Sequence, residues 1–156
     1  MTAQAAIAWP IPSSLRDEHR ELHKELDLAT RAPGRLGAAA RAVATALHPH
    51  FLREEEIALP PLGLLARLSQ GPPTAEMRPV LALTDALKRE LPAMLKEHQT
   101  IGRALDELAR VAREEGAVEY VELSEKIRAH ALNEEEVLYP AAILVGEFVR
   151  SRLGGA

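Results

Sequence analysis

The sequence has no cysteine among its 156 residues, which excludes disulfide bonds, thiolate zinc sites and cysteine nucleophiles. Aromatic residues are also scarce, at 3% of the chain, whereas alanine and leucine supply most of its apolar side chains. Because alanine and leucine have high helix propensity and strands favour β-branched or aromatic residues, this composition favours helices over sheets.

The sequence also lacks an excess of basic residues and any long apolar run. Its net charge is -4, so clustered lysine and arginine of the kind that binds phosphates are not expected, and we predict no nucleic-acid partner. No apolar run approaches the ~18–20 residues of a membrane span. Residues 1–9 lack the basic and apolar regions of a secretory signal. We therefore expect a cytoplasmic protein without membrane association, and no pattern assigns an oligomeric state.

The chain has enough apolar residues, 47% of the total, to bury one core in a single domain. Proline and glycine divide it into long segments with helical periodicity. We expect kinks at Pro79 and Pro92 within the third long helix and an end or bend at Pro140. The predicted domains are an N-terminal arm over residues 1–12 and a helical domain over residues 13–153. The predicted helices cover residues 13–30, 35–58, 74–114 and 118–139, with a connector helix at 62–69 and an amphipathic tail to 153.

An internal repeat organises these helices. Two strings that contain histidine and glutamate occur twice, at an offset of 79 to 80 residues. The repeated unit is an αα-hairpin, and its two copies predict an all-α, up-down-up-down four-helix bundle. The paired strings are Glu18-His19 with Glu97-His98, and His50-Phe-Leu-Arg-Glu54 with His130-Ala-Leu-Asn-Glu134.

Six polar residues in these strings occupy positions where the apolar stripe of each helix predicts a core side chain. In the second helix, Val43, Leu47 and Ile57 follow such a stripe. His50 and Glu54 complete its 4-3-4-3 spacing and therefore point toward the core. The same spacing selects the whole set of candidate metal-ligating residues: His19, His50, Glu54, His98, His130 and Glu134.

Helix geometry excludes the neighbouring glutamates as ligands. Glu55 and Glu56 lie ~100° and ~200° further round the helix than Glu54, so we expect them at the surface or supporting the site. Glu135 and Glu136 stand in the same relation to the second buried glutamate. Buried carboxylates without partners are costly, whereas two cations would remove that cost. Four imidazoles with two carboxylates form a suitable ligand set, so the sequence predicts a two-metal site.

This set of residues resembles the ligand pattern of the hemerythrin-like (HHE cation-binding) domain family, over about residues 13–140. The resemblance implies a four-helix bundle around a non-haem di-iron centre, with two iron ions joined by an oxo or hydroxo bridge. It also implies that the four histidines are terminal ligands and that Glu54 and Glu134 are bridging carboxylates. The matching strings are His19, His50-x-x-x-Glu54, His98 and His130-x-x-x-Glu134.

The sequence departs from the oxygen-carrying hemerythrins at one position. Those proteins carry a second histidine four residues after the first on their third helix, whereas Gly102 stands four residues after His98 here. A histidine occurs instead at the symmetry-related position, His23, four residues after His19, and it either reaches the metal or flanks it. Tyr139 either donates a hydrogen bond at the site or packs at the helix end with its hydroxyl in water.

With four histidines and two shared glutamates, the irons retain one or more open coordination positions, so we expect the protein to bind O₂, NO or peroxide. Two alternatives stay open: a peroxide-decomposing (catalase-like) di-iron enzyme, and a non-catalytic regulatory module that senses iron or oxygen. Ferritin-like carboxylate enzymes use a Glu-x-x-His element, and many zinc hydrolases use His-Glu-x-x-His. The sequence contains neither element, which argues against both classes.

Overall fold

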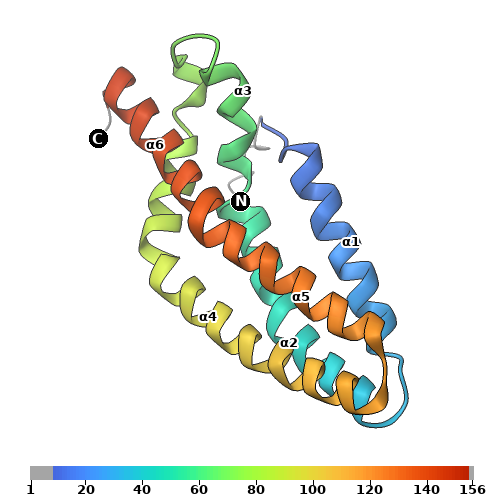
Figure 1. Cartoon of the computed structure of the whole chain (residues 1–156). Helices are drawn as coiled ribbons and strands as arrows, with labels where there is room; N and C mark the ends of the chain where they lie inside the picture. The colour runs from blue at the N-terminus through green and yellow to red at the C-terminus, as the bar shows by residue number, and fades with distance from the viewer. Residues whose placement is uncertain (1–8, 155–156) are drawn as a thin grey trace, which may run out of the picture.

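The computed structural model describes residues 9–154, and these residues form four antiparallel helical segments without any strand (Figure 1). The first three segments are α1 (Ser13–Ala29), α2 (Gly34–Ile57) and α4 (Val80–Glu115), and the fourth starts with α5 (Val118–Asn133). Around the bundle, α1 packs against α2 and α5, and α4 packs against the same two helices. The predicted all-α four-helix bundle is confirmed.

The fourth segment continues beyond α5 as a long rod (Figure 1). Its middle is a π-helical turn, η3 (Glu134–Leu138), and its last part is α6 (Tyr139–Leu153). Pro140 lies in the first turn of α6, where the missing N–H of proline is tolerated. The sequence predicted either an end or a bend of the helix at Pro140. The helix does not end there but continues to Leu153.

The two prolines at which kinks were predicted differ in their positions relative to α4. Pro79 stands at the N-terminal end of α4, after a short 3₁₀ turn, η2 (Ala75–Met77). Pro92 lies inside α4, which continues through it to Glu115. At that end the chain turns at Gly116, whose φ of 71° is a left-handed conformation that glycine adopts without strain.

The connection between α2 and α4 covers one end of the bundle. It contains η1 (Pro60–Leu64) and α3 (Leu65–Leu68), in the region predicted as a connector helix. The N-terminal part of the chain passes close to η1: a Cβ at Gly63 would lie 2.3 Å from the carbonyl oxygen of Pro10. Only glycine therefore admits the incoming chain at this point.

The predicted N-terminal arm is described only from Trp9 onward, since residues 1–8 lie outside the described part of the chain. Trp9 is 5% exposed and packs with Leu64 and Met77. The division into an arm over residues 1–12 and a helical domain over the following residues stays a prediction.

Two apolar clusters fill the bundle, one on each side of a layer of buried polar side chains. Along α2, Leu47 belongs to the first cluster and Ile57 to the second. Along the fourth segment, Ile127 belongs to the first cluster and Tyr139 to the second. The histidines and glutamates between these residues are buried, so apolar packing shields the polar layer from both ends.

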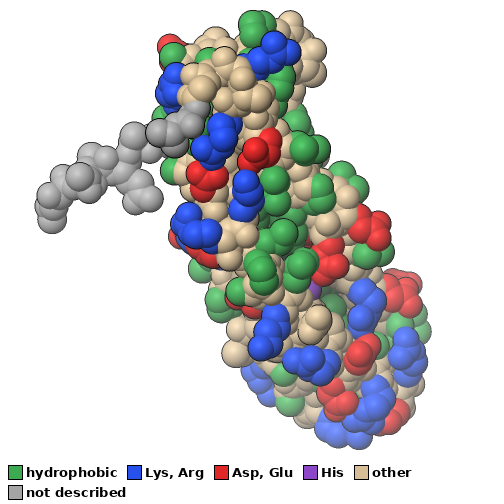
Figure 2. Space-filling view, turned by 90° about the vertical axis from the view of Figure 1, so that its left-hand side faces the viewer, with side chains coloured by type: hydrophobic (Ala, Val, Ile, Leu, Met, Phe, Trp, Pro, Cys, Tyr) green, Lys and Arg blue, Asp and Glu red, His purple; other side chains and the backbone are tan. Residues whose placement is uncertain are grey.

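The surface carries charges of both signs. On the face shown in Figure 2, basic and acidic side chains are interspersed with apolar ones, and histidine is barely visible. Within residues 9–154, none of the helices combines enough length with enough apolar character to cross a membrane.

Candidate metal centre

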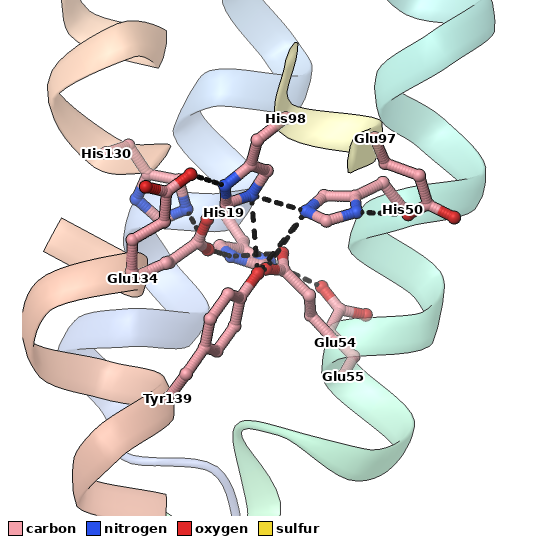
Figure 3. Close-up of polar contacts among 10 residues, drawn as sticks. His19, His50, Glu54, Glu55, Glu97, His98, His130, Glu134 and Tyr139 are labelled. Atoms are coloured by element: carbon pink, nitrogen blue, oxygen red, sulfur yellow. Dashed lines mark hydrogen bonds and ion pairs between the residues drawn. The ribbon is translucent and has the colours of Figure 1, made fainter. Parts of the chain in front are cut away.

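The six residues predicted to bind metal lie together in the buried polar layer (Figure 3). Four helices contribute one histidine each, and each glutamate follows a histidine of its own segment by one helical turn. No member of the set is more than 7% exposed. The residues are His19 on α1, His50 and Glu54 on α2, His98 on α4, His130 on α5 and Glu134 at the start of η3.

Their side chains form two overlapping groups, each with two histidines and both glutamates. In each group, one donor atom of every residue lies within 4.8 Å of the others. Because a carboxylate has two oxygens, a glutamate that belongs to both groups can face two cation positions at once. We call them the His19 group, with His19, Glu54, His130 and Glu134, and the His50 group, with His50, Glu54, His98 and Glu134.

The donor atoms in each group are spaced as neighbours around one cation. In the His50 group, the Nε2 atoms of His50 and His98 lie 2.8 Å apart. In the His19 group, Glu134 Oε1 lies 2.7 Å from His130 Nε2 and 3.4 Å from His19 Nε2. Donors bound at right angles to a cation, with bonds of ~2.1 Å, lie roughly 3 Å apart. All four histidines therefore present Nε2 to the centre.

A second set of glutamates holds the outer nitrogens of the four histidines. Each Nδ1 lies within 3.2 Å of a glutamate on the next segment round the bundle, from α1 to α2, α2 to α4, α4 to η3, and α5 back to α1. A carboxylate at one ring nitrogen keeps the proton there and leaves the other nitrogen free to bind a cation. The pairs are His19 with Glu55 (3.2 Å), His50 with Glu97 (2.6 Å), His98 with Glu135 (2.8 Å) and His130 with Glu18 (3.0 Å).

The sequence indicates the role of these outer glutamates only indirectly. Glu55 and Glu135 are expected from helix geometry at the surface or supporting the site, and Glu18 and Glu97 have no predicted role. All four recur at the repeat offset, and each is the immediate sequence neighbour of a candidate ligand. That adjacency was the available signal for a supporting role.

Burial and mutual contacts shift the pKa values of the candidate ligands. Burial acts to lower the pKa of His50, but its contacts with Glu54 and other carboxylates raise it to about 9. Burial also acts to lower the pKa of His130, but its contact with Glu134 raises this pKa to about 9. Burial acts to raise the pKa of Glu134, yet close contacts with His130, His19 and His98 hold it well below its usual range. Imidazolium protons thus balance the buried carboxylate, and a cation has to displace them.

Two inward polar atoms, Glu54 Oε2 and His130 Nε2, have no hydrogen-bond partner within the described residues. The outer His130 Nδ1 also lacks one, because its 3.0 Å contact with Glu18 is an ion pair without hydrogen-bond direction. Glu54 Oε2 lies 3.7 Å from His19 Nε2, which is too far for a hydrogen bond. His130 Nε2 approaches Glu134 Oε1 closely but without the direction that a hydrogen bond requires. Because unpaired buried polar atoms are unfavourable, both observations fit a cation in the His19 group.

The family follows from a comparison with known sequence families. The sequence model of the hemerythrin HHE cation binding domain matches residues 11–142. The chain belongs to this family. No curated protein and no solved structure matches the chain. The two overlapping His/Glu groups of this hemerythrin domain are consistent with a di-metal site, in agreement with a cation-binding function.

His23 lies outside both groups of the hemerythrin domain. Its Nδ1 is 2.9 Å from Nδ1 of His48, and the two rings are stacked with centroids 4.8 Å apart. His48 Nε2 in turn lies 3.5 Å from Asp27. Phe51 contacts His23 edge-on and stacks on His19 with centroids 4.1 Å apart. Of the two roles left open by the sequence, flanking the centre is the one that the structure supports.

Tyr139 is 1% exposed and directs its hydroxyl into the His50 group (Figure 3). The hydroxyl donates a hydrogen bond to Glu54 Oε1 and lies 3.4 Å from His50 Nε2 and 3.3 Å from His98 Nε2. Burial, together with the charge of Glu54, raises the pKa of the phenol above its ordinary value. Of the two positions left open by the sequence, the structure shows the hydroxyl at the site.

Two surface clefts border the centre of the hemerythrin domain. One, of about 360 Å³, is lined in part by His98, Gly102 and Glu135. The other, of about 410 Å³, is lined in part by Glu18 and His130. Gly102, at the position where oxygen carriers have a second histidine, therefore faces a cleft.

Proposed function

We propose that this hemerythrin-like domain holds two non-haem iron ions and binds O₂, NO or peroxide at an open coordination position. In this proposal the four histidines are terminal ligands, Glu54 and Glu134 bridge the irons, and an oxo or hydroxo group completes the bridge. The observation that supports it most directly is the pair of four-residue groups that share both glutamates. One cation in each group gives each glutamate two cations to bridge.

The donor set suits iron. Imidazole nitrogen and carboxylate oxygen are ligands that iron binds readily, and the chain has no cysteine to favour a softer metal. Zinc favours a separate tetrahedral site, whereas both positions here draw on the same two carboxylates. Glu54 Oε2 and His130 Nε2, which have no hydrogen-bond partner among the described residues, are buried donors that a cation would engage.

The protein's own residues prepare this centre for a small ligand. Bound iron would supply an exchangeable coordination position and a change of oxidation state. The outer glutamates keep protons on Nδ1, so that the Nε2 lone pairs face inward. The apolar clusters exclude bulk water, and the clefts beside His98 and His130 bring solvent close to the buried layer. Burial of every candidate ligand restricts access to small molecules.

Iron analysis combined with the absorption spectrum of aerobic, iron-loaded protein tests this function. We expect about two irons per chain, with charge-transfer bands that shift when azide or peroxide is added. Consumption of peroxide by the same sample would identify the catalase-like enzyme rather than a carrier. Two irons with no response to any ligand would leave only the regulatory module. Stoichiometric zinc, or no metal, after growth with ample iron would contradict the di-iron proposal.

Substitution of single ligands tests which residues hold the metal. Glu54→Ala and His130→Ala are expected to lose or halve the iron content, because each removes a donor that no neighbour replaces. Glu56→Ala is the matched control, since its side chain is 63% exposed and pairs with Arg53. An equal loss of iron in Glu56→Ala and Glu54→Ala would show that the wrong carboxylate was assigned.

A further inference from the structure

Different side chains occupy the position five residues after each shared glutamate. Leu59 follows Glu54, and Tyr139 follows Glu134. The Leu59 N–H donates to the Glu54 carbonyl at 2.9 Å, and the Tyr139 N–H donates to the Glu134 carbonyl. These are the i to i+5 hydrogen bonds of a π-type turn, and both side chains are almost fully buried. The repeated backbone thus presents an apolar side chain in one half and a hydroxyl in the other.

The Tyr139 hydroxyl serves only one of the two groups. Among the described residues, its polar contacts are Glu54 Oε1, His50 Nε2 and His98 Nε2. His50 and His98 belong to the His50 group alone. Glu54 belongs to both groups, but its Oε1 lies 3.2 Å from His50 Nε2, whereas its Oε2 is the oxygen that faces His19. The hydroxyl has no hydrogen bond with His19 or His130 within residues 9–154, so it distinguishes the two cation positions.

The hydroxyl oxygen is spaced like the other donors of the His50 group. It lies 3.4 Å from His50 Nε2 and 3.3 Å from His98 Nε2. Within the same group, His98 Nε2 lies 3.3 Å from Glu134 Oε2. These distances are close to the roughly 3 Å between neighbouring donors on one octahedral cation. The phenol oxygen therefore stands where a further donor of the same cation would stand.

We propose that the Tyr139 oxygen is a fifth protein ligand of the cation in the His50 group, so that the two metal positions are unequal. The inference rests on the di-metal centre proposed above. Five protein donors and the bridging group complete six positions around this cation. The His19 group has four protein donors among the described residues, so its cation keeps the open position, and the exogenous ligand binds there. Ligation releases the phenolic proton to solvent when the metal is loaded.

The test is detection of ionised tyrosine in the metal-loaded full-length protein near neutral pH. Because a free tyrosine phenol has a pKa of about 10, an ionised tyrosine near neutral pH indicates that its oxygen binds a cation. Iron-loaded protein is expected to show a phenolate-to-iron charge-transfer band with phenolate ring modes in the resonance Raman spectrum. Tyr139→Phe should lose both signals and keep its irons. Tyr120→Phe, which changes the only other tyrosine, should retain both signals.

The wild-type spectrum decides the matter even if Tyr139→Phe fails to fold. Two bound irons without phenolate modes would overturn the ligand assignment. Azide adds a second criterion: one azide per chain is expected in wild type, and two would contradict unequal positions.

Loading with zinc separates this inference from the iron proposal. If the protein takes zinc and not iron, the iron proposal fails. A ligating Tyr139 would still produce the ultraviolet difference band of one ionised tyrosine per chain. Zinc loading at two ions per chain without that band would reject Tyr139 as a ligand whatever the natural metal.

Discussion

At the residue scale, each candidate ligand histidine is oriented by a carboxylate that is not itself a candidate ligand. Glu97 illustrates the arrangement: its side chain is 51% exposed, yet its Oε2 lies 2.6 Å from His50 Nδ1. Such a carboxylate fixes the tautomer of the ring and increases the basicity of the inner nitrogen. In the proposed centre, the outer ring of glutamates would therefore control how strongly the four histidines bind a cation.

Glu97→Gln is expected to weaken iron binding by about 10–100-fold, because the amide keeps the shape but removes the charge that supports His50. The number of irons at saturation should remain two, since no inner donor is lost. Competition with a chelator measures the affinity, and Glu56→Gln is the control, because its exposed side chain pairs with Arg53. Equal affinities of Glu97→Gln and wild type would show that the outer contact does not support the site.

The metal-free protein is expected to lose stability as pH rises from 6.5 to about 9. His50 and His130 have folded-state pKa values of about 9, above their ordinary value of 6.5. Raised values mean that folding favours the protonated rings, so the stabilisation is complete below pH 6.5 and is lost as pH passes 9. Urea unfolding of metal-free protein across this range measures the effect, and a constant free energy of unfolding would contradict it.

His23→Ala is expected to retain two irons, because His23 pairs with His48 outside both groups. His19→Ala, one turn earlier on the same helix, should lose iron. Iron analysis of the two purified variants makes the comparison, and equal losses would place His23 among the ligands.

At the element scale, the π turn of η3 explains why the sequence predicted the inner ligands but left Tyr139 open. On a regular α-helix, a residue five positions after Glu134 lies about 140° away from it. The wider π turn reduces this angle and brings Tyr139 onto the same face. Apolar spacing identified His130 and Glu134 because it follows α-helical periodicity up to η3. It gives no sign of a local change of helix type.

Prolines show the same limit of sequence-based prediction. Pro79 lies just before the first residue of α4 rather than within the predicted helix, whereas Pro92 and Pro140 lie within helical segments that continue through them. Whether proline breaks a helix depends on how the neighbouring segments pack, and the local sequence does not determine that packing. For a related reason the sequence assigned no role to Glu18 and Glu97 and left a supporting role for Glu55 and Glu135 as one of two possibilities, since each acts on a histidine of another helix.

The contact between α4 and α6 depends on a glycine. A Cβ at Gly146 would lie 2.1 Å from Thr84 Oγ1, a buried atom on α4. Gly146→Ala is therefore expected to lower the free energy of unfolding by about 1–3 kcal/mol through overpacking. Urea denaturation measures this change. Gly71→Ala, where an added Cβ meets nothing within 4 Å, should leave stability nearly unchanged, and an equal effect of both substitutions would contradict the packing argument.

At the scale of the whole molecule, two similar hairpins enclose the centre. Each hairpin contributes two histidines and one glutamate, but the contacts around these residues differ between the two hairpins. The repeat predicted the bundle and the six inner residues, because an apolar stripe and its polar interruptions are properties of single helices. The structure adds the closed order of the outer contacts round the four segments and the difference between Leu59 and Tyr139. Membership of the hemerythrin HHE family agrees with the bundle and with a cation-binding function.

Anomalous X-ray diffraction at the iron absorption edge, from crystals of iron-loaded protein, would locate the metal ions relative to the six inner residues. We expect two iron peaks per chain, one bound by His19 and His130 and the other by His50 and His98, with Glu54 and Glu134 bound to both. A single peak, or two peaks that do not share these glutamates, would contradict the proposed centre.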